Sequence, residues 1–165
     1  VSTELLGGSN GIGFHYDSRF KGNSGWGYGI GAGWGFSQSS DFFNNVDRYH
    51  NLSVIPRINY LLGRKNRKLE LGFGVNLGYL FGKQEYDTYK LVSQDDGTYY
   101  FDFDKHVKKN RHQFTYFFFG NIGYRRQANH GFVFRVGLAP IFGFGDSHTV
   151  DKFYLVPYLG FGKSF

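Results

Sequence analysis

The sequence contains no cysteine, only three prolines and no long hydrophobic run among its 165 residues. Without cysteine, the chain can form no disulfide framework, no thiolate nucleophile and no zinc–thiolate site. Without a run of about 18 or more apolar residues, it encodes no transmembrane helix. A membrane protein is still possible, because strands of a membrane barrel need only about 9–11 residues, of which alternate ones are apolar.

Glycine and aromatic residues are abundant instead, with 25 glycines and 21% Phe, Trp and Tyr. Disordered chains are poor in aromatic residues, so this composition predicts an ordered protein. The length suits one domain, and we predict a single domain over residues 1–165. The chain starts at Val1 without a charged segment followed by an apolar one, so we expect a processed or trimmed mature protein.

Apolar residues recur at every second position along much of the chain, which is the period of a β-strand with one apolar face. In residues 69–81 one parity is apolar or aromatic throughout, whereas the other carries Glu70, Asn76 and several glycines. The same alternation runs through residues 12–20, 52–62, 114–124 and 132–142. A water-soluble sandwich would carry more solvating charges on its second face. The pattern therefore favours apolar side chains facing lipid and small or polar ones facing inward.

The most regular stretch is GWGYGIGAGWGF, in which every second residue from Gly25 to Gly35 is glycine. Glycines at this period do not form the G-x-G-x-x-G pattern of a phosphate-binding loop, so we predict a strand whose glycines face the barrel lumen. Trp26 and Trp34 are separated by about 26 Å of strand at roughly 3.3 Å per residue, which suits the two aromatic girdles of a membrane barrel. We expect Arg57 and the pair Phe117 and Phe119 to fill the space beside the glycines.

Turn signals divide the chain into eight expected strands, near residues 1–8, 11–20, 25–36, 51–62, 68–82, 112–125, 131–143 and 153–165. The connections alternate between short ones, at 21–25, 63–68 and 126–131, and longer ones, at 37–50, 83–111 and 144–152. The tight GSNG turn at 8–11 is an exception. Short turns on one side and longer loops on the other are typical of outer-membrane barrels. The predicted fold class is therefore all-β, an eight-stranded antiparallel up-and-down transmembrane β-barrel.

Basic residues gather at the short turns, namely Lys21, Arg64, Lys65, Arg67, Lys68, Arg125 and Arg126, whereas cations and acids balance in the loop 83–111. We interpret the basic rim as one whose side chains reach phospholipid headgroups. No basic patch is interleaved with a stacking platform, so no nucleic-acid partner is expected.

The chain ends in YLGFGKSF, with Leu159, Phe161 and Phe165 on one parity. This ending resembles the carboxy-terminal signal of bacterial outer-membrane barrels, which the barrel assembly machinery reads. With its eight expected strands, the chain resembles the OmpA transmembrane domain, OmpX and PagL. The phrases VIPRINYLLGRKNRKLELGFGVNLGYL and FVFRVGLAPIFGFG are most similar to uncharacterised outer-membrane barrels. The resemblance implies a place in the bacterial outer membrane with both termini in the periplasm, in contact with phospholipid and lipopolysaccharide.

Polar and charged residues lie on the inward parity, namely Glu4, His15, Asp17, Arg19, Arg57, Asn59, Glu70, Asn76, Asn121, Arg125 and Arg135. Side chains just fill the interior of an eight-stranded barrel, so we expect no open pore. Buried charges must be paired, and we predict an ionic network that plugs the half of the barrel nearer the short turns. The alternative is a gated ion or proton path.

The sequence predicts no catalytic, cofactor-binding or metal site and no cofactor. His15, Asp17 and Arg19 alternate on one strand face, but no serine follows them at a spacing that would make a nucleophile–base pair. PagL-type lipid A deacylases carry a His-x-Ser motif, and no histidine of this chain stands in one. Asp102 and Asp104 could contact a divalent cation, but alternating residues on a strand do not close a cage around one.

The loop 83–111 contains Asp95, Asp96 and Gly97 between two stretches rich in tyrosine, which predicts a hairpin that extends the flanking strands. Its tyrosines and mixed charges suit contact with another outer-membrane protein or a saccharide. We expect a non-enzymatic barrel with a structural, surface-interaction or accessory-subunit role in a larger outer-membrane complex. The alternatives are a lipid A or phospholipid-modifying enzyme and, as a third class, a soluble lipocalin-like barrel.

Overall fold

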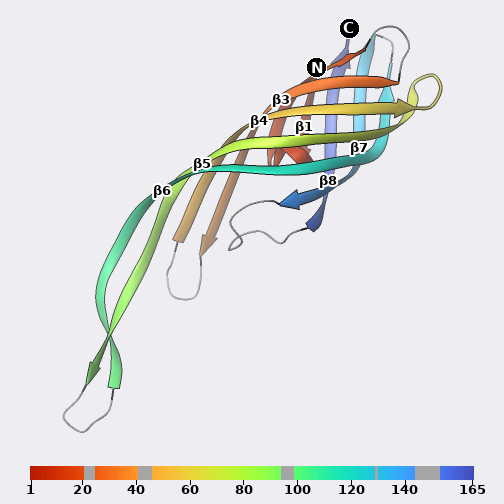
Figure 1. Cartoon of the computed structure of the whole chain (residues 1–165). Helices are drawn as coiled ribbons and strands as arrows, with labels where there is room; N and C mark the ends of the chain where they lie inside the picture. The colour runs from red at the N-terminus through yellow and green to blue at the C-terminus, as the bar shows by residue number, and fades with distance from the viewer. Residues whose placement is uncertain (21–24, 41–45, 94–98, 129, 144–152) are drawn as a thin grey trace. The chain divides into compact units, whose positions relative to one another are not determined.

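The structure is a computed structural model that describes residues 1–20, 25–40, 46–93, 99–128, 130–143 and 153–165. Its elements in chain order are β1 (Ser2–Leu6), the 3-10 turn η1 (Gly7–Ser9), β2 (Ile12–Arg19), β3 (Trp26–Ser40), β4 (Val46–Leu62), β5 (Arg67–Ser93), β6 (Tyr99–Gln127), β7 (Gly131–Gly143) and β8 (Phe153–Ser164) (Figure 1). The prediction of an all-β chain with eight strands is confirmed. Among the described residues, no helix is both long enough and apolar enough to cross a membrane.

The eight strands form one closed antiparallel ring in which each strand lies between its neighbours in the sequence. The ring closes because β1 pairs with both β2 and β8, so that Thr3 lies opposite Phe14 on one side and Phe161 on the other. Within the part of unit 1 that the structure describes, closure pairs each strand on both sides, which removes the usual site of edge-to-edge aggregation.

The described residues that flank the connections β2–β3, β4–β5 and β6–β7 lie with both chain termini at one end of the ring, which we call the short-turn end. Backbone hydrogen bonds link these segments: Leu61 N donates to Gly25 O at 2.8 Å, and Gln127 N donates to Asn66 O at 2.9 Å. The amino group of Val1 donates to Lys163 O at 2.9 Å, which ties the two termini together.

The glycine-rich strand alternates as predicted. In β3 the side chains from Trp26 to Phe36 on the even parity are exposed, whereas the glycines from Gly27 to Gly35 are buried. The β2 register places His15 opposite Gly31 and Asp17 opposite Gly29.

The prediction of what fills the space beside these glycines is half correct. A Cβ built on Gly29 would lie 2.6 Å from Asp17 Oδ1 and 3.2 Å from Arg57 Nε, which confirms Arg57. The prediction of Phe117 and Phe119 is wrong, because neither ring is among the nearest neighbours of a β3 glycine. In a closed sheet, these neighbours come mainly from the two adjacent strands.

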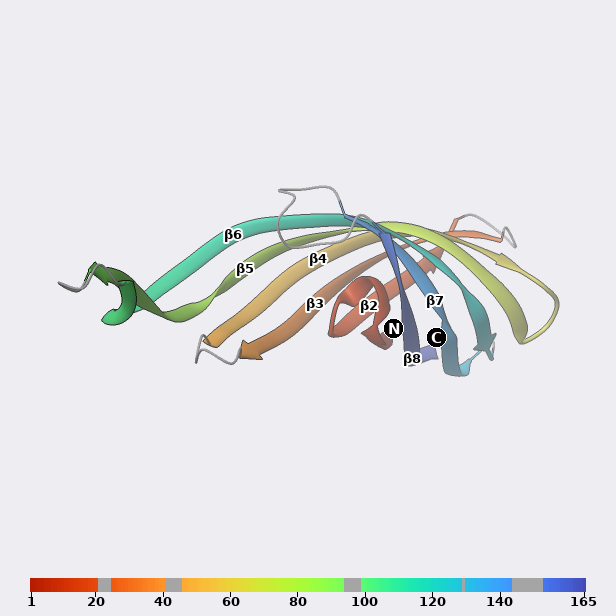
Figure 2. The same cartoon turned by 90° about the horizontal axis from the view of Figure 1, so that it is seen from below.

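The first connection is an inward turn, not a tight hairpin. β1 ends at Leu6, two residues before the predicted end of the strand, and Leu6, Gly7 and Asn10 have positive φ angles of 61°, 56° and 50°. This backbone turns Gly7, Gly8 and Ser9 into the ring, where all three are buried (Figure 2, red). A Cβ on Gly8 would collide with the ring of Phe119, and Asn76 Nδ2 donates to Gly8 O at 2.9 Å.

The chain divides into two compact units, and the prediction of a single domain over residues 1–165 stays a prediction. Unit 1 holds residues 1–35, 51–79 and 114–165, and unit 2 holds residues 36–50 and 80–113.

Within unit 2, strand continues through 83–93 and 99–111, as the predicted hairpin requires, while its turn at 95–97 lies outside the described residues. The predicted connection 37–50 is mostly strand, because β3 runs to Ser40 and β4 begins at Val46. The predicted loop 144–152 lies outside the described residues.

Candidate functional site

The inside of the ring in unit 1 is the candidate site, because it collects the polar residues that the alternation predicted to face inward. Of those predicted residues, these are buried to 4% exposure or less: Glu4, His15, Arg57, Asn59, Glu70, Asn76, Asn121, Arg125 and Arg135. Asp17 and Arg19, near the end of β2, are of intermediate exposure. The inward placement of these residues is therefore confirmed.

Arg135 on β7 is the centre of an ionic network. Its Nε donates to Glu70 Oε2 at 2.8 Å, and its Nη2 donates to Glu70 Oε1 at 2.9 Å, which is a bidentate pair. Its Nη1 donates to Glu4 Oε2 at 2.8 Å. The planar guanidinium thus joins β1, β5 and β7 across the inside of the ring.

Arg57 on β4 extends the network to β2. Its Nη1 donates to Glu4 Oε2 at 3.0 Å, and its Nη2 donates to both carboxylate oxygens of Asp17 at 3.2 Å. Arg125 on β6 contacts the other side of the cluster, with Nη1 3.4 Å from Glu70 Oε1 and 3.5 Å from Asp17 Oδ2. Six strands therefore contribute charged side chains to one continuous cluster.

The charges of this cluster are nearly balanced. The carboxylates of Glu4, Asp17 and Glu70 oppose the guanidinium groups of Arg57, Arg125 and Arg135. Arg19 adds a further cation, which donates to Asn59 Oδ1 at 2.7 Å and to Gly25 O at 3.4 Å. Because Asp17 and Arg125 are near strand ends at the short-turn end, the predicted location of the network is confirmed.

An apolar layer occupies the inside of the ring beyond the ionic network. Ile55, Phe119 and Ile141 are fully buried together there, and Phe117 and Val156 pack against them. Asn76 bridges this region to the inward turn by donating to Gly8 O and to Ser53 Oγ. The described interior is thus filled by a polar layer, an apolar layer and the inward turn.

The inward turn creates a cluster of Ser9, His15 and Glu4 that the sequence did not predict. Ser9 Oγ lies 2.9 Å from His15 Nε2 and donates to Glu4 Oε1 at 3.1 Å. The His-x-Ser motif places the serine after the histidine, whereas Ser9 precedes His15 and lies in a turn. No local pattern shows that this turn folds inward.

The burial of this cluster distinguishes it from an accessible serine–histidine pair. A general base must accept the proton of the attacking hydroxyl. Ser9 Oγ is within donating distance of Glu4 Oε1, and the direction of its contact with His15 Nε2 depends on the tautomer of the histidine. All three residues are at most 1% exposed, which leaves no access for a lipid substrate.

His106 and two acids of unit 2, Glu85 and Asp87, take part in surface ion pairs. His106 Nδ1 lies 2.6 Å from Asp87 Oδ1, and Lys108 Nζ lies 3.4 Å from Glu85 Oε1. Within the described parts of the chain, no three residues of the types His, Cys, Asp and Glu come close enough to hold a metal ion.

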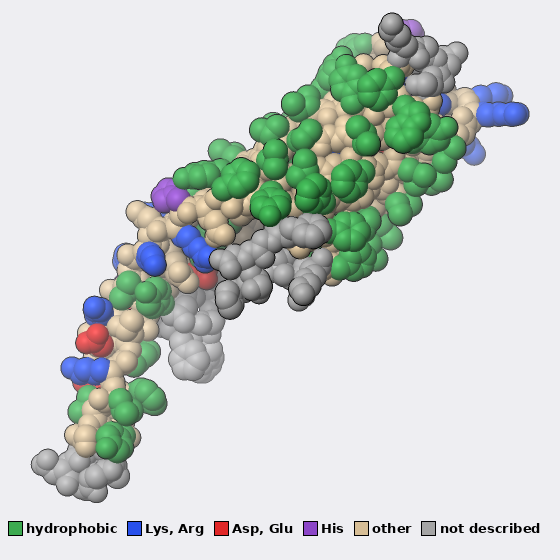
Figure 3. Space-filling model, in the orientation of Figure 1, with side chains coloured by type: hydrophobic (Ala, Val, Ile, Leu, Met, Phe, Trp, Pro, Cys, Tyr) green, Lys and Arg blue, Asp and Glu red, His purple; other side chains and the backbone are tan. Residues whose placement is uncertain are grey.

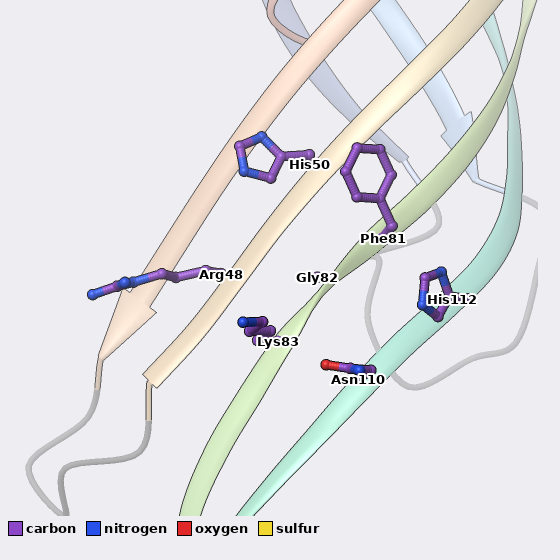
Figure 4. Close-up of a pocket in the computed structure, with 7 residues that line it drawn as sticks. All are labelled: Arg48, His50, Phe81, Gly82, Lys83, Asn110 and His112. Atoms are coloured by element: carbon purple, nitrogen blue, oxygen red, sulfur yellow. The ribbon is translucent and has the colours of Figure 1, made fainter.

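Unit 2 also has an open hollow of about 380 Å³ on its surface (Figure 4). Its lining residues come from three strands and are Arg48, His50, Phe81, Gly82, Lys83, Asn110 and His112. These residues form no motif in the sequence, because each group of two or three lies on a different strand and only strand pairing brings them together.

Comparison with known proteins gives no match. No family model fits the chain, and no curated protein and no solved structure is significantly similar to it. The resemblance to the OmpA transmembrane domain, OmpX and PagL therefore stays a prediction. The structure supports the coarser statement that the chain is an eight-stranded antiparallel all-β sheet compatible with a small β-barrel.

Proposed function

We propose that this protein is a small integral β-barrel of the bacterial outer membrane. Its interior is closed, and its role is structural, surface-interacting or that of an accessory subunit. The observation that carries the proposal is the inversion of polarity between the two faces of the ring. Charged groups occupy the inside, and every strand carries large apolar residues that are at least 39% exposed, for example Leu5, Phe14, Ile30, Val54, Phe73, Ile122, Phe132 and Leu155.

Such an outer surface does not suit water. Soluble monomers rarely expose contiguous apolar patches larger than a few hundred Å². Figure 3 shows hydrophobic side chains over much of the visible face of the strands, with Lys and Arg side chains near the β4–β5 turn. A hydrocarbon environment explains the apolar face, and the basic short-turn end suits contact with lipid phosphates.

The topology supports an orientation with both termini in the periplasm, because outer-membrane barrels have their short turns on that side. The strand β8 carries Phe161 outward and ends next to Phe165, which is 80% exposed. This end of the chain is the segment that we propose for recognition by the barrel assembly machinery. The hairpin formed by residues 83–111 is the segment that we propose for contacts with other outer-membrane proteins.

The filled interior favours a non-enzymatic protein that does not conduct solutes. A conducting path would need a continuous polar lumen, whereas here Ile55, Phe119 and Ile141 close the described interior beyond the ionic network. The lipid-modifying alternative would have to use other residues than the buried Ser9 and His15.

Fractionation tests the membrane assignment. We expect the protein to stay in the outer-membrane pellet after extraction with alkaline carbonate, and to migrate faster on an unboiled gel than after boiling. Recovery of the native protein in the aqueous phase without detergent would overturn the assignment and revive the soluble lipocalin-like class.

Two further experiments distinguish the roles. Affinity purification in mild detergent should recover other outer-membrane proteins if the barrel is an accessory subunit, and this role fails if the barrel purifies alone. Mass spectra of lipid A and phospholipids from deletion and overexpression strains should be unchanged. An altered acyl pattern would instead establish the lipid-modifying alternative.

A further inference from the structure

The hollow on unit 2 is built from side chains that share one face of three neighbouring strands. Arg48 and His50 stand two residues apart on β4, as do Phe81 and Lys83 on β5 and Asn110 and His112 on β6. Residues two apart on a strand point to the same side, so each pair presents both members to the hollow. Figure 4 shows the members of these pairs on the three strands.

These pairs form two layers with different chemistry. One layer consists of rings, in which His50 and Phe81 stack with centroids 5.6 Å apart and His112 follows on the next strand. The other layer consists of hydrogen-bond donors and cations, namely Arg48, Lys83 and Asn110. A guanidinium, an ammonium and an amide among the lining residues are suited to the oxygens of a phosphate group.

The positive charge of the hollow is not neutralised locally. No acid is among its lining residues, and neither Arg48 nor Lys83 forms an ion pair with a residue that the structure describes. The next acids along the same face of β5 are Glu85 and Asp87, which are already engaged by Lys108 and His106. Among the charged residues near the hollow, Asp47, Lys109 and Arg111 lie on the opposite parity of their strands. Asp102 and Asp104 share the parity of Asn110 on β6 but stand eight and six residues from it along the strand.

Along each of the three strands, the residues on the parity that faces outward change from apolar to polar at the position of the hollow. Leu52, Tyr79 and Phe114 stand two residues from His50, Phe81 and His112 along their strands, and all three are exposed. The two cations and the amide stand two residues from the ring layer in the opposite direction along the strands. A row that passes from aliphatic and aromatic residues to cations within a few positions is typical of side chains at a lipid headgroup level.

We propose that this hollow binds the phosphate group of an anionic membrane lipid, with Arg48 and Lys83 as its charged contacts and Asn110 as a neutral donor. The histidine and phenylalanine rings border the glycerol or sugar that carries the phosphate. The site rests on the proposed function, because it needs the outward face of the strands to meet a membrane.

Binding of labelled phosphatidic acid in neutral-detergent micelles, measured by fluorescence anisotropy, tests the site on the full chain. We expect wild type to bind phosphatidic acid more tightly than phosphatidylcholine. The double variant Arg48→Gln/Lys83→Gln should raise the dissociation constant roughly 30-fold, which corresponds to about 1 kcal/mol for each cation. Lys83→Gln alone should raise it roughly 5-fold.

The control variant Lys90→Gln/Lys105→Gln removes the same net charge from exposed positions of β5 and β6 outside the hollow. It should bind phosphatidic acid as wild type does. The site is wrong if Arg48→Gln/Lys83→Gln binds like wild type, if both double variants lose binding equally, or if inorganic phosphate displaces the lipid. All variants must keep their heat-dependent gel migration, and if the double variant fails to fold, Lys83→Gln alone decides.

The two proposals fail in distinguishable ways. If wild type is extracted into the aqueous phase by carbonate, the membrane assignment fails whatever its affinity for phosphatidic acid. If wild type stays in the membrane but the Arg48→Gln/Lys83→Gln variant keeps its affinity, only the phosphate site fails.

Discussion

The single residues on which stability depends most are those that neutralise a buried charge inside the ring. Arg135 contacts two carboxylates from strands that are far apart in the sequence, and it is 0% exposed. A buried ion pair adds little stability over apolar side chains packed in its place. Removing one partner, however, leaves the other charge unpaired in a medium of low polarity, which destabilises the fold strongly. The ionic network is therefore sensitive to loss of any one member.

Replacing Arg135 by methionine tests this sensitivity. Arg135→Met roughly keeps the side-chain volume but leaves Glu4 and Glu70 short of their closest cation, so we expect a loss of about 3–5 kcal/mol of stability. The denaturant midpoint and the heat resistance of the band on an unboiled gel measure it. Arg64→Ala, which removes an exposed cation at the β4–β5 turn, is the control and should be neutral. Wild-type heat resistance in Arg135→Met would show that the network is not buried in the native protein.

Replacing Ser9 by alanine separates a structural serine from a nucleophile. Ser9→Ala removes the donor to Glu4 and the partner of His15, so we expect a loss of about 1–3 kcal/mol from buried groups left unpaired. The lipid A and phospholipid acyl pattern of cells that overexpress the protein should not differ between Ser9→Ala and wild type. A pattern that changes with wild type but not with Ser9→Ala would identify Ser9 as catalytic.

At the scale of an element, β3 and the inward turn show two uses of glycine. Along β3, glycines leave room for long side chains on the adjacent strands, as Gly29 does for Asp17 and Arg57. In the turn, Gly7 adopts a φ of 56°, a region where residues with a Cβ are strained, and Gly8 lies against the ring of Phe119.

Enlarging one face of β3 but not the other tests the first of these uses. Gly29→Leu forces a side chain into the space held by Asp17 and Arg57, so we expect a loss of at least about 1–3 kcal/mol and a lower refolding yield. Ala32→Leu adds a similar volume on the exposed face and should refold as wild type does. Equal yields for the two variants would contradict the assignment of inside and outside.

At the scale of the whole chain, the apolar outer face is the feature that needs an explanation. Large apolar residues on all eight strands are exposed, whereas a set of buried charged residues converges inside the ring. If this face meets a membrane, as proposed, the cost of a charge placed on it should depend on depth in the membrane.

Arginine substitutions at two depths test the surroundings. Ile30 stands midway between Trp26 and Trp34 on the outward face of β3, so Ile30→Arg should destabilise the folded protein in lipid vesicles by about 2–4 kcal/mol. Leu62→Arg lies beside the basic β4–β5 turn and should cost only about 0–1 kcal/mol. Unfolding by guanidinium in vesicles measures both. A protein that lives in water would show the opposite trend, with Ile30→Arg improving solubility at no cost.

The fold and the identity of the inward residues could be predicted because both depend on local geometry. Successive side chains of a strand point to opposite faces, so the parity of Glu70 or Arg135 decides its face without knowledge of the rest of the chain. The glycine row of β3 and the strand extensions through 83–93 and 99–111 are confirmed for the same reason.

Only the tertiary structure decided which of these residues meet. Glu4 and Arg135 are 131 residues apart, and their contact depends on ring closure and on the register of several strand pairs. The sequence misassigned Phe119 to the β3 glycines, because the inward turn that brings Gly8 against this ring has no local signal. The alternation of a strand is a property of its own backbone. Pairings across the ring and the hollow on unit 2 instead depend on distant segments, whose positions no single strand encodes.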